Sequence, residues 1–86
     1  MTFTRTLTIE DSSQITDIAY SPSKSQMIVA FMNGQTYLYD GVDQFSFGAL
    51  ASADSVGAAF NRMKAGLTQY IKLSDAEVKS LGVWFL

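Results

Sequence analysis

The sequence has no cysteine, no histidine and a single proline. Without cysteine there are no disulfides and no thiolate nucleophile, and without histidine there is no imidazole base. The usual zinc ligands are missing with them. We therefore expect no catalytic residue, no metal and no cofactor, and we expect side-chain packing to stabilise the fold.

Charge is also scarce in this short chain. Of its 86 residues only 16% are charged, against 48% hydrophobic, and the net charge is −2. The six basic residues are scattered and outnumbered by eight acids, which disfavours nonspecific nucleic-acid binding by the isolated monomer. So small a domain has a thin core, and we expect part of its apolar surface to meet another chain.

Long apolar runs and targeting segments are missing as well. No run approaches the roughly 20 residues needed to span a bilayer, and no charged segment followed by an apolar one opens the chain. We therefore predict a cytoplasmic protein without a membrane partner; if it is phage-encoded, the host cytoplasm or the virion is its place.

Four extended runs predict an antiparallel β-meander. Residues 2–9 alternate threonine with mostly apolar residues, and residues 14–20 and 26–32 are rich in β-branched and aromatic side chains. Asn33-Gly34 is a strong hairpin signal, from which the chain returns through residues 35–40.

The turn at Gly34 decides which side chains share a face of the sheet. A two-residue turn places Tyr37 and Tyr39 on one face of the sheet and Met27 and Val29 on the other. A three-residue turn with Gly34 in the left-handed region puts all four side chains on the same face. We favour the second, because it collects the aromatic side chains into one layer that a helix can cover. The other face is then also largely apolar: Ile28, Ala30, Met32, Thr36 and Leu38.

Helical spacing follows the strands. Residues 43–51 predict a short helix, and the main helix starts at Asp54 or Ser55 and runs towards Gly66. The capping signature that begins at Ser74 opens a short helix that ends at Gly82. The fold class is therefore α+β: an antiparallel meander of three to four strands, one main helix on one face and a short C-terminal helix, in a single domain of residues 1–86.

An ordered series of residues resembles the KTSC domain family, which is named after the C-terminus of some lysyl-tRNA synthetases and has stand-alone bacterial and phage members. The matching residues, between about 12 and 64, are Ser12, Ile15, Ile18, Tyr20, Val29, Phe31, Asn33, Gly34, Tyr37, Tyr39, Gly41, Val42, Ala53, Ser55, Gly57, Phe60 and Asn61. The strand 2–9 and the extension 65–86 lie outside the resemblance. The resemblance implies a small α+β module, for which RNA binding has been suggested.

The two tyrosines of the Tyr37-Leu38-Tyr39 motif allow two interpretations. They form a platform on which bases stack, or they pack under the main helix with their hydroxyls at its rim. Other polar residues have simpler structural roles: Ser55 and Gly57 suit a helix start better than a phosphate loop, and Asp40 with Asp43 suits a turn better than a cation site or a carboxylate pair.

The second sheet face and the C-terminal tail are the remaining candidate interaction residues. Ile28, Met32 and Leu38 lie on that face, and the chain closes with Trp84, Phe85 and Leu86. The tail either completes the core of its own chain or anchors in a neighbouring subunit, where tryptophan is enriched among hot spots. Deleting residues 83–86 is predicted to weaken association if the tail binds in trans and to unfold the domain if it packs in cis.

These patterns favour a non-enzymatic interaction or assembly module that associates with itself or with a larger complex. A phage-encoded virion accessory subunit is its most specific form. The first alternative is an RNA-associated module that uses Tyr37 and Tyr39, with Arg62, Lys64 and Lys72 aligned beside them by oligomerisation. The second is a phage protein that binds a small ligand or inhibits a host factor.

Overall fold

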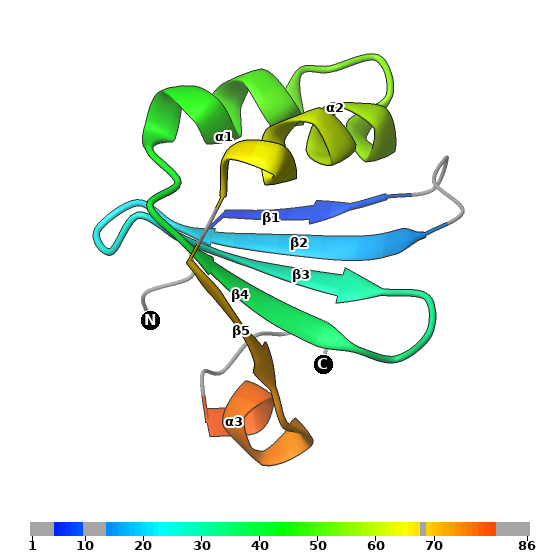
Figure 1. The fold of residues 1–86 in the computed structure, drawn as a ribbon, viewed down its shortest axis with the longest axis vertical. Helices are drawn as coiled ribbons and strands as arrows, with labels where there is room; N and C mark the ends of the chain where they lie inside the picture. The colour runs from blue at the N-terminus through cyan, green and yellow to red at the C-terminus, as the bar shows by residue number, and fades with distance from the viewer. Residues whose placement is uncertain (1–4, 10–13, 68, 81–86) are drawn as a thin grey trace.

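The computed structural model describes residues 5–9, 14–67 and 69–80, and its centre is one antiparallel sheet (Figure 1). The strands lie in chain order, β1-β2-β3-β4-β5. Their bounds are β1 Arg5–Thr8, β2 Ile15–Ser21, β3 Gln26–Phe31, β4 Thr36–Asp40 and β5 Tyr70–Leu73. The predicted α+β meander is confirmed, but it has a fifth strand at its edge.

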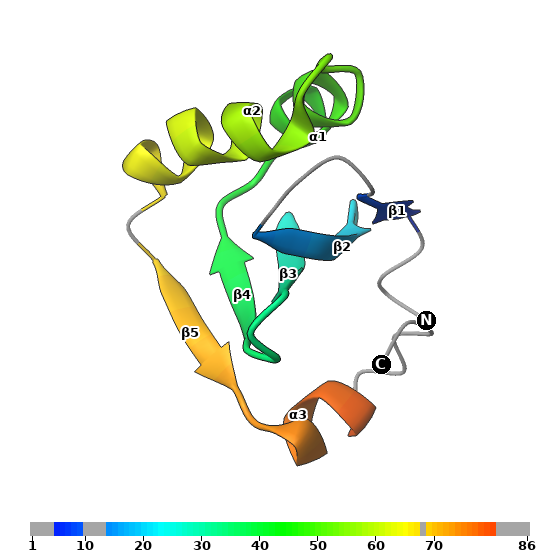
Figure 2. The same ribbon diagram turned by 90° about the vertical axis from the view of Figure 1, so that its right-hand side faces the viewer.

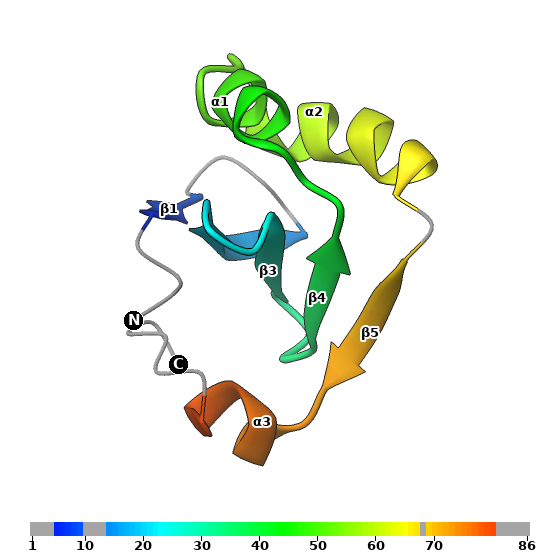
Figure 3. The ribbon, with the colours of Figure 1, turned by 90° about the vertical axis from the view of Figure 1, so that its left-hand side faces the viewer.

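Four helical segments accompany the sheet. They are α1 Gln44–Ala51, α2 Val56–Met63, the 3-10 turn η1 Lys64–Gly66 and α3 Asp75–Ser80. Figures 2 and 3 show α1 and α2 on one side of the sheet and α3 on the other, joined to β5. The helix layer therefore has the two helices that the sequence predicted over residues 43–51 and after Ser55, but the second, expected to be the main helix, has the same length of 8 residues as the first.

Helix starts follow the local capping chemistry. The Asp43 side chain accepts a hydrogen bond from the Ser46 amide at 2.7 Å, and Ser55 Oγ accepts one from the Ala58 amide at 3.3 Å. At α3 the Ser74 amide donates to Glu77 Oε1 while the Glu77 amide donates to Ser74 Oγ. Both predicted capping sites are thus confirmed, with Ser55 rather than Asp54 at the start of α2.

The β3–β4 hairpin has the three-residue turn that was favoured. The Phe31 amide donates to the Gln35 carbonyl, and the Gly34 amide donates back to the Phe31 carbonyl. Gly34 has φ 87°, in the left-handed region. Met27 pairs with Tyr39 and Val29 with Tyr37, so these side chains share one face, as predicted.

The main core lies between that face and helices α1 and α2. Tyr20 of β2 stacks on Phe47 of α1 with ring centroids 4.4 Å apart, and its hydroxyl donates to the Val42 carbonyl at 2.7 Å. Phe60 of α2 and Leu50 of α1 are also buried. The aromatic layer predicted from the hairpin parity is therefore real, and Tyr20 extends it to the second strand.

The opposite sheet face is largely covered within the single chain. Ile28 and Ala19 are fully buried, and Ala30, Thr36 and Leu73 are nearly so. The sequence left open whether the chain itself or another subunit covers this face. Because Ile28 is buried within one chain, the middle of this face is not available to a partner. Leu38 is half-buried. The tail residues Trp84, Phe85 and Leu86 lie outside the described residues.

Candidate functional site

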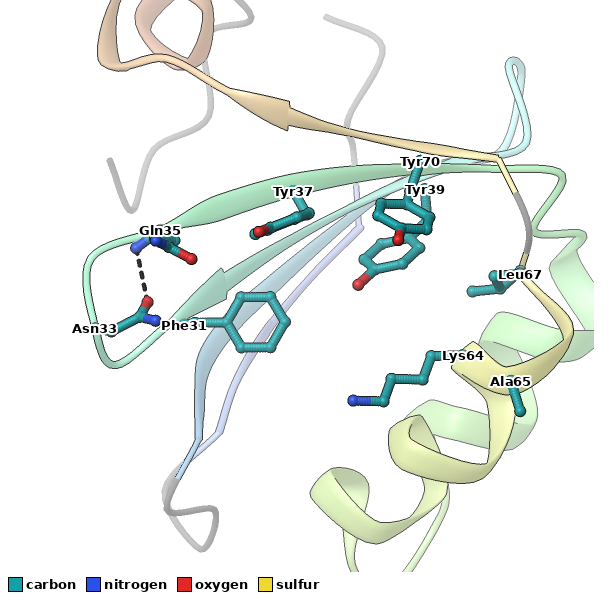
Figure 4. Close-up of a pocket in the computed structure, with 9 residues that line it drawn as sticks. All are labelled: Phe31, Asn33, Gln35, Tyr37, Tyr39, Lys64, Ala65, Leu67 and Tyr70. Carbon is teal, nitrogen blue, oxygen red and sulfur yellow. Dashed lines mark hydrogen bonds between the residues drawn. The ribbon is translucent and has the colours of Figure 1, made fainter.

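A groove opens where the hairpin, the end of the helix layer and β5 meet, and we call it the tyrosine groove (Figure 4). Its volume is about 530 Å³, within the range of about 300–1,000 Å³ that small-ligand sites occupy. Its lining residues are Phe31, Asn33, Gln35, Tyr37, Tyr39, Lys64, Ala65, Leu67 and Tyr70. The Gln35 amide donates to Asn33 Oδ1 at 3.0 Å, which fixes the hairpin end of the groove.

A continuous series of ring contacts builds the wall of the groove. Phe60 contacts Tyr39 with centroids 5.4 Å apart, and Tyr39 contacts Tyr70 at 5.5 Å. Tyr70 contacts Tyr37 at 6.1 Å, and Tyr37 meets the edge of Phe31 at 5.7 Å. Each such pair contributes about 0.5–1.5 kcal/mol beyond its buried area, so the wall is preorganised.

Exposure rises along this series from the core to the rim. Phe60 is fully buried, Tyr39 is 7% exposed, Tyr37 is half-buried and Tyr70 is 56% exposed. Burial, and then the nearby Tyr37 and Tyr70, raise the pKa of Tyr39 above its ordinary value. Tyr39 therefore packs in the core, while Tyr37 and Tyr70 present ring surface to a ligand.

One lysine lines the groove and a second lies next to it. Figure 4 shows the Lys64 side chain extending from η1 across the opening towards Phe31. Lys72 pairs directly with Tyr37 across β4 and β5, so it projects on the same face as the tyrosines, and it is exposed. Among the described residues that line the groove there is no acid. A chain of net charge −2 thus concentrates cations at its aromatic groove.

The third cation of the predicted basic stripe lies elsewhere. Arg62 lines a smaller groove of about 410 Å³ between α1 and α2, which we call the helix groove. Phe45 of α1 stands at this groove and is 87% exposed. The monomer therefore brings Lys64 and Lys72 to the tyrosines without Arg62.

Sequence reasoning missed Tyr70, because residues 65–86 were taken as an extension without a strand. The available signal was the short alternation Tyr70-Ile71-Lys72-Leu73, which is typical of a strand with one covered face. Of the other predicted interaction residues, Met32 is 60% exposed in the hairpin turn. It lies between Phe31 and Asn33 but does not itself line the tyrosine groove.

The turn acids and the glycine-serine helix start have structural contacts. Asp43 caps α1, and this hydrogen bonding to Ser46 lowers the pKa of its carboxyl. Asp40 Oδ1 accepts from the Gly41 amide at 3.2 Å. Within residues 5–9, 14–67 and 69–80, no three acids lie close enough together to hold a metal ion. No helix in the same ranges has the length and apolar character to cross a membrane.

Comparison with known proteins identifies the family. The family model of the KTSC domain matches residues 11–65, more than half of the sequence. The chain belongs to the KTSC family. A search of curated proteins gives no match. Among solved structures, the crystal structure of a KTSC domain protein from Yersinia pestis is similar, with a TM-score of 0.72 and 27% identity over 81% of this chain and 97% of that one.

Proposed function

We propose that this KTSC chain is a non-enzymatic binding module that stacks bases of single-stranded RNA on Tyr37 and Tyr70. The observation that carries the proposal is the pair of accessible tyrosine rings in a groove that Lys64 also lines, with Lys72 next to Tyr37 on the same sheet face. Aromatic faces next to cations are the combination by which proteins hold single strands without reading their sequence. The basic residues are scattered along the sequence, so the sequence alone does not place lysines beside these rings in a single chain.

The ring geometry defines how a base would bind. Tyr37 and Tyr70 contact each other at 6.1 Å and are tilted by 45°, so a base stacks on an exposed ring face rather than between them. Each stacked base contributes about 1–3 kcal/mol. Lys64 and Lys72 then pair with flanking phosphates. Two stacked bases and two cations give an affinity of a single groove in roughly the millimolar to micromolar range.

Fluorescence anisotropy with labelled single-stranded oligouridylate tests the proposal. Tyr70→Ala removes the more exposed ring and is expected to weaken binding roughly 5- to 150-fold, the equivalent of one stacked base. Phe45→Ala is the matched control, because it removes an even more exposed ring from the helix groove. Equal affinities of the wild type and the Tyr70 variant would refute the proposal.

Salt dependence separates stacking from phosphate contact. Each phosphate contact on a single strand changes the slope of log K against log salt by about 0.7. Lys64→Gln is therefore expected to flatten the slope by about that amount while leaving the domain folded, since Lys64 is exposed and makes no ion pair with any described residue. An unchanged slope would remove Lys64 from the site.

The second candidate function is the assembly module, and the exposed Phe45 favours it. A phenylalanine 87% exposed beside an apolar groove is the type of residue that anchors protein interfaces. Phe45→Ser should then abolish docking on a larger complex without affecting RNA binding; retained docking would exclude this surface. A virion role and the small-ligand or host-factor alternative stay predictions from the sequence.

A further inference from the structure

Strand β5 forms an open edge of the sheet next to the tyrosine groove. Figures 2 and 3 show no other described element beyond it. Tyr70 and Ile71, consecutive on this strand, are 56% and 53% exposed on opposite faces. An uncovered edge with apolar side chains is a template for pairing with another strand.

The backbone groups that face outward follow from the β4–β5 hydrogen bonds. The Asp40 amide donates to the Gln69 carbonyl at 2.9 Å, in the same register that pairs Leu38 with Ile71. Directly opposite residues of an antiparallel pair alternate between bonded and non-bonded positions. Gln69 and Ile71 therefore bond towards β4, whereas the amides and carbonyls of Tyr70 and Lys72 point to the open edge.

We propose that β5 pairs antiparallel with β5 of a second copy, about a two-fold axis through Ile71. In this register the backbone of Tyr70 in one copy forms hydrogen bonds with the backbone of Lys72 in the other, and the two-fold axis repeats this pair. The two Ile71 side chains lie opposite each other on the second face of the sheet. Lysine then lies over tyrosine, a favourable cation–π arrangement, whereas centring the axis on Lys72 would place two lysines opposite each other. Of these two registers, the one about Ile71 is the one that places lysine opposite tyrosine.

This pairing would extend the tyrosine groove. Directly paired residues share a face, so the grooves of both copies lie on the same side of one continuous sheet. Lys72 of each copy stands beside Tyr70 of the other, which adds a cation to each groove. The inference goes beyond the proposed function and does not depend on what the groove binds.

The test uses the absence of cysteine from the chain. In the proposed register the two Ile71 positions form a non-bonded pair, at a Cα separation of about 4.5 Å that a disulfide can bridge. Air oxidation of Ile71→Cys is expected to give covalent dimers at least tenfold faster than that of Phe45→Cys, a control on α1 whose side chain is more exposed, 87% against 53%. Light scattering should show the wild-type mass doubling as concentration rises.

A charge variant completes the test. Ile71→Lys places like charges opposite each other at the axis and should hold the protein at the mass of one chain, whereas Phe45→Lys should leave the doubling unchanged. Ile71 faces away from the groove, so Ile71→Lys also leaves RNA contacts of a single groove in place and separates the two proposals. A wild type of constant single-chain mass, or equal cross-linking of both cysteine variants, would overturn the inference.

Discussion

Two aromatic clusters have opposite environments, although their tyrosines lie on the same sheet face: the covered cluster of Tyr20 and Phe47, and the open cluster of Tyr37 and Tyr70. Tyr20 stacks on Phe47 at 4.4 Å, is fully buried and bonds its hydroxyl to the Val42 carbonyl. Tyr37 and Tyr70 also contact each other, but their rings reach solvent and their hydroxyls bond to no described residue. The tyrosines of both clusters lie on the same sheet face, so the cover above them makes the difference.

The cover ends where the helix layer turns away from the sheet. Helix α1 lies over Tyr20, whereas α2 ends at Met63 and η1 directs the chain to the sheet edge as β5. Tyr39 of β4 still packs against Phe60 of α2, whereas the rings of Tyr37 on β4 and Tyr70 on β5 remain partly open to solvent. A tyrosine with a buried ring and a bonded hydroxyl has a structural role, and a tyrosine with an open ring beside a lysine is available for binding.

Side-chain truncation in the covered cluster of Tyr20 and Phe47 should cause the largest loss of stability. Phe47→Ala removes the ring that stacks on Tyr20 and leaves a cavity in a thin core, so we expect a loss of about 3–5 kcal/mol in the free energy of unfolding. Urea denaturation followed by circular dichroism measures it. Tyr70→Ala, at the exposed end, should cost far less; comparable losses would show that both clusters are core.

Removing one hydroxyl from each cluster gives a finer comparison. Tyr20→Phe leaves the Val42 carbonyl without this donor and should cost about 1–2 kcal/mol. Tyr37→Phe should change the free energy of unfolding by no more than about 0.5 kcal/mol, because its hydroxyl bonds to no described residue. The same urea titrations report both values, and a larger loss at Tyr37 than at Tyr20 would reverse our assignment of the two clusters.

Alkaline pH should probe Tyr39, which joins the covered and open regions. Its pKa is raised in the folded state by burial and by its neighbours, so the folded protein holds the phenolic proton more tightly than the unfolded chain. The contribution of the protonated Tyr39 to folding stability is fully present below the pKa of a tyrosine in the unfolded chain, about 10. It is lost as pH rises through the pKa of Tyr39 in the folded protein. Thermal unfolding between neutral and alkaline pH should show the decline, and Tyr39→Phe should reduce it; an identical decline in this variant would assign it elsewhere.

Much of the fold is local and was therefore predictable. The hairpin register follows from Gly34, because a left-handed residue in a three-residue turn sets the parity of every side chain after it. The starts of α2 and α3 follow from Ser55 and Ser74, which bond to amides only three residues away. KTSC membership rests on an ordered string of such residues and could also be recognised from the sequence.

The groove depends on contacts that are distant along the chain and could not be predicted. Tyr70 contacts Tyr37 and Tyr39 only because β5 returns to pair with β4 after two helices. The alternation of a four-residue strand is too short to predict this pairing from the sequence. The same return places Lys72 beside Tyr37, so cations that are scattered in sequence gather in space. Burial of Ile28 could not be predicted either, because the apolar pattern of a strand does not identify which part of the chain, or which partner, covers that face.

Ligand binding by this protein is proposed to reside in the open cluster of Tyr37 and Tyr70. Titration of isotope-labelled protein with single-stranded oligouridylate, followed by two-dimensional amide NMR, tests it most directly. We predict saturating shifts at Tyr37, Lys64, Tyr70 and Lys72, with the amides around Tyr20 and Phe45 unmoved. Shifts confined to the helix groove around Phe45, or none at millimolar RNA, would contradict it.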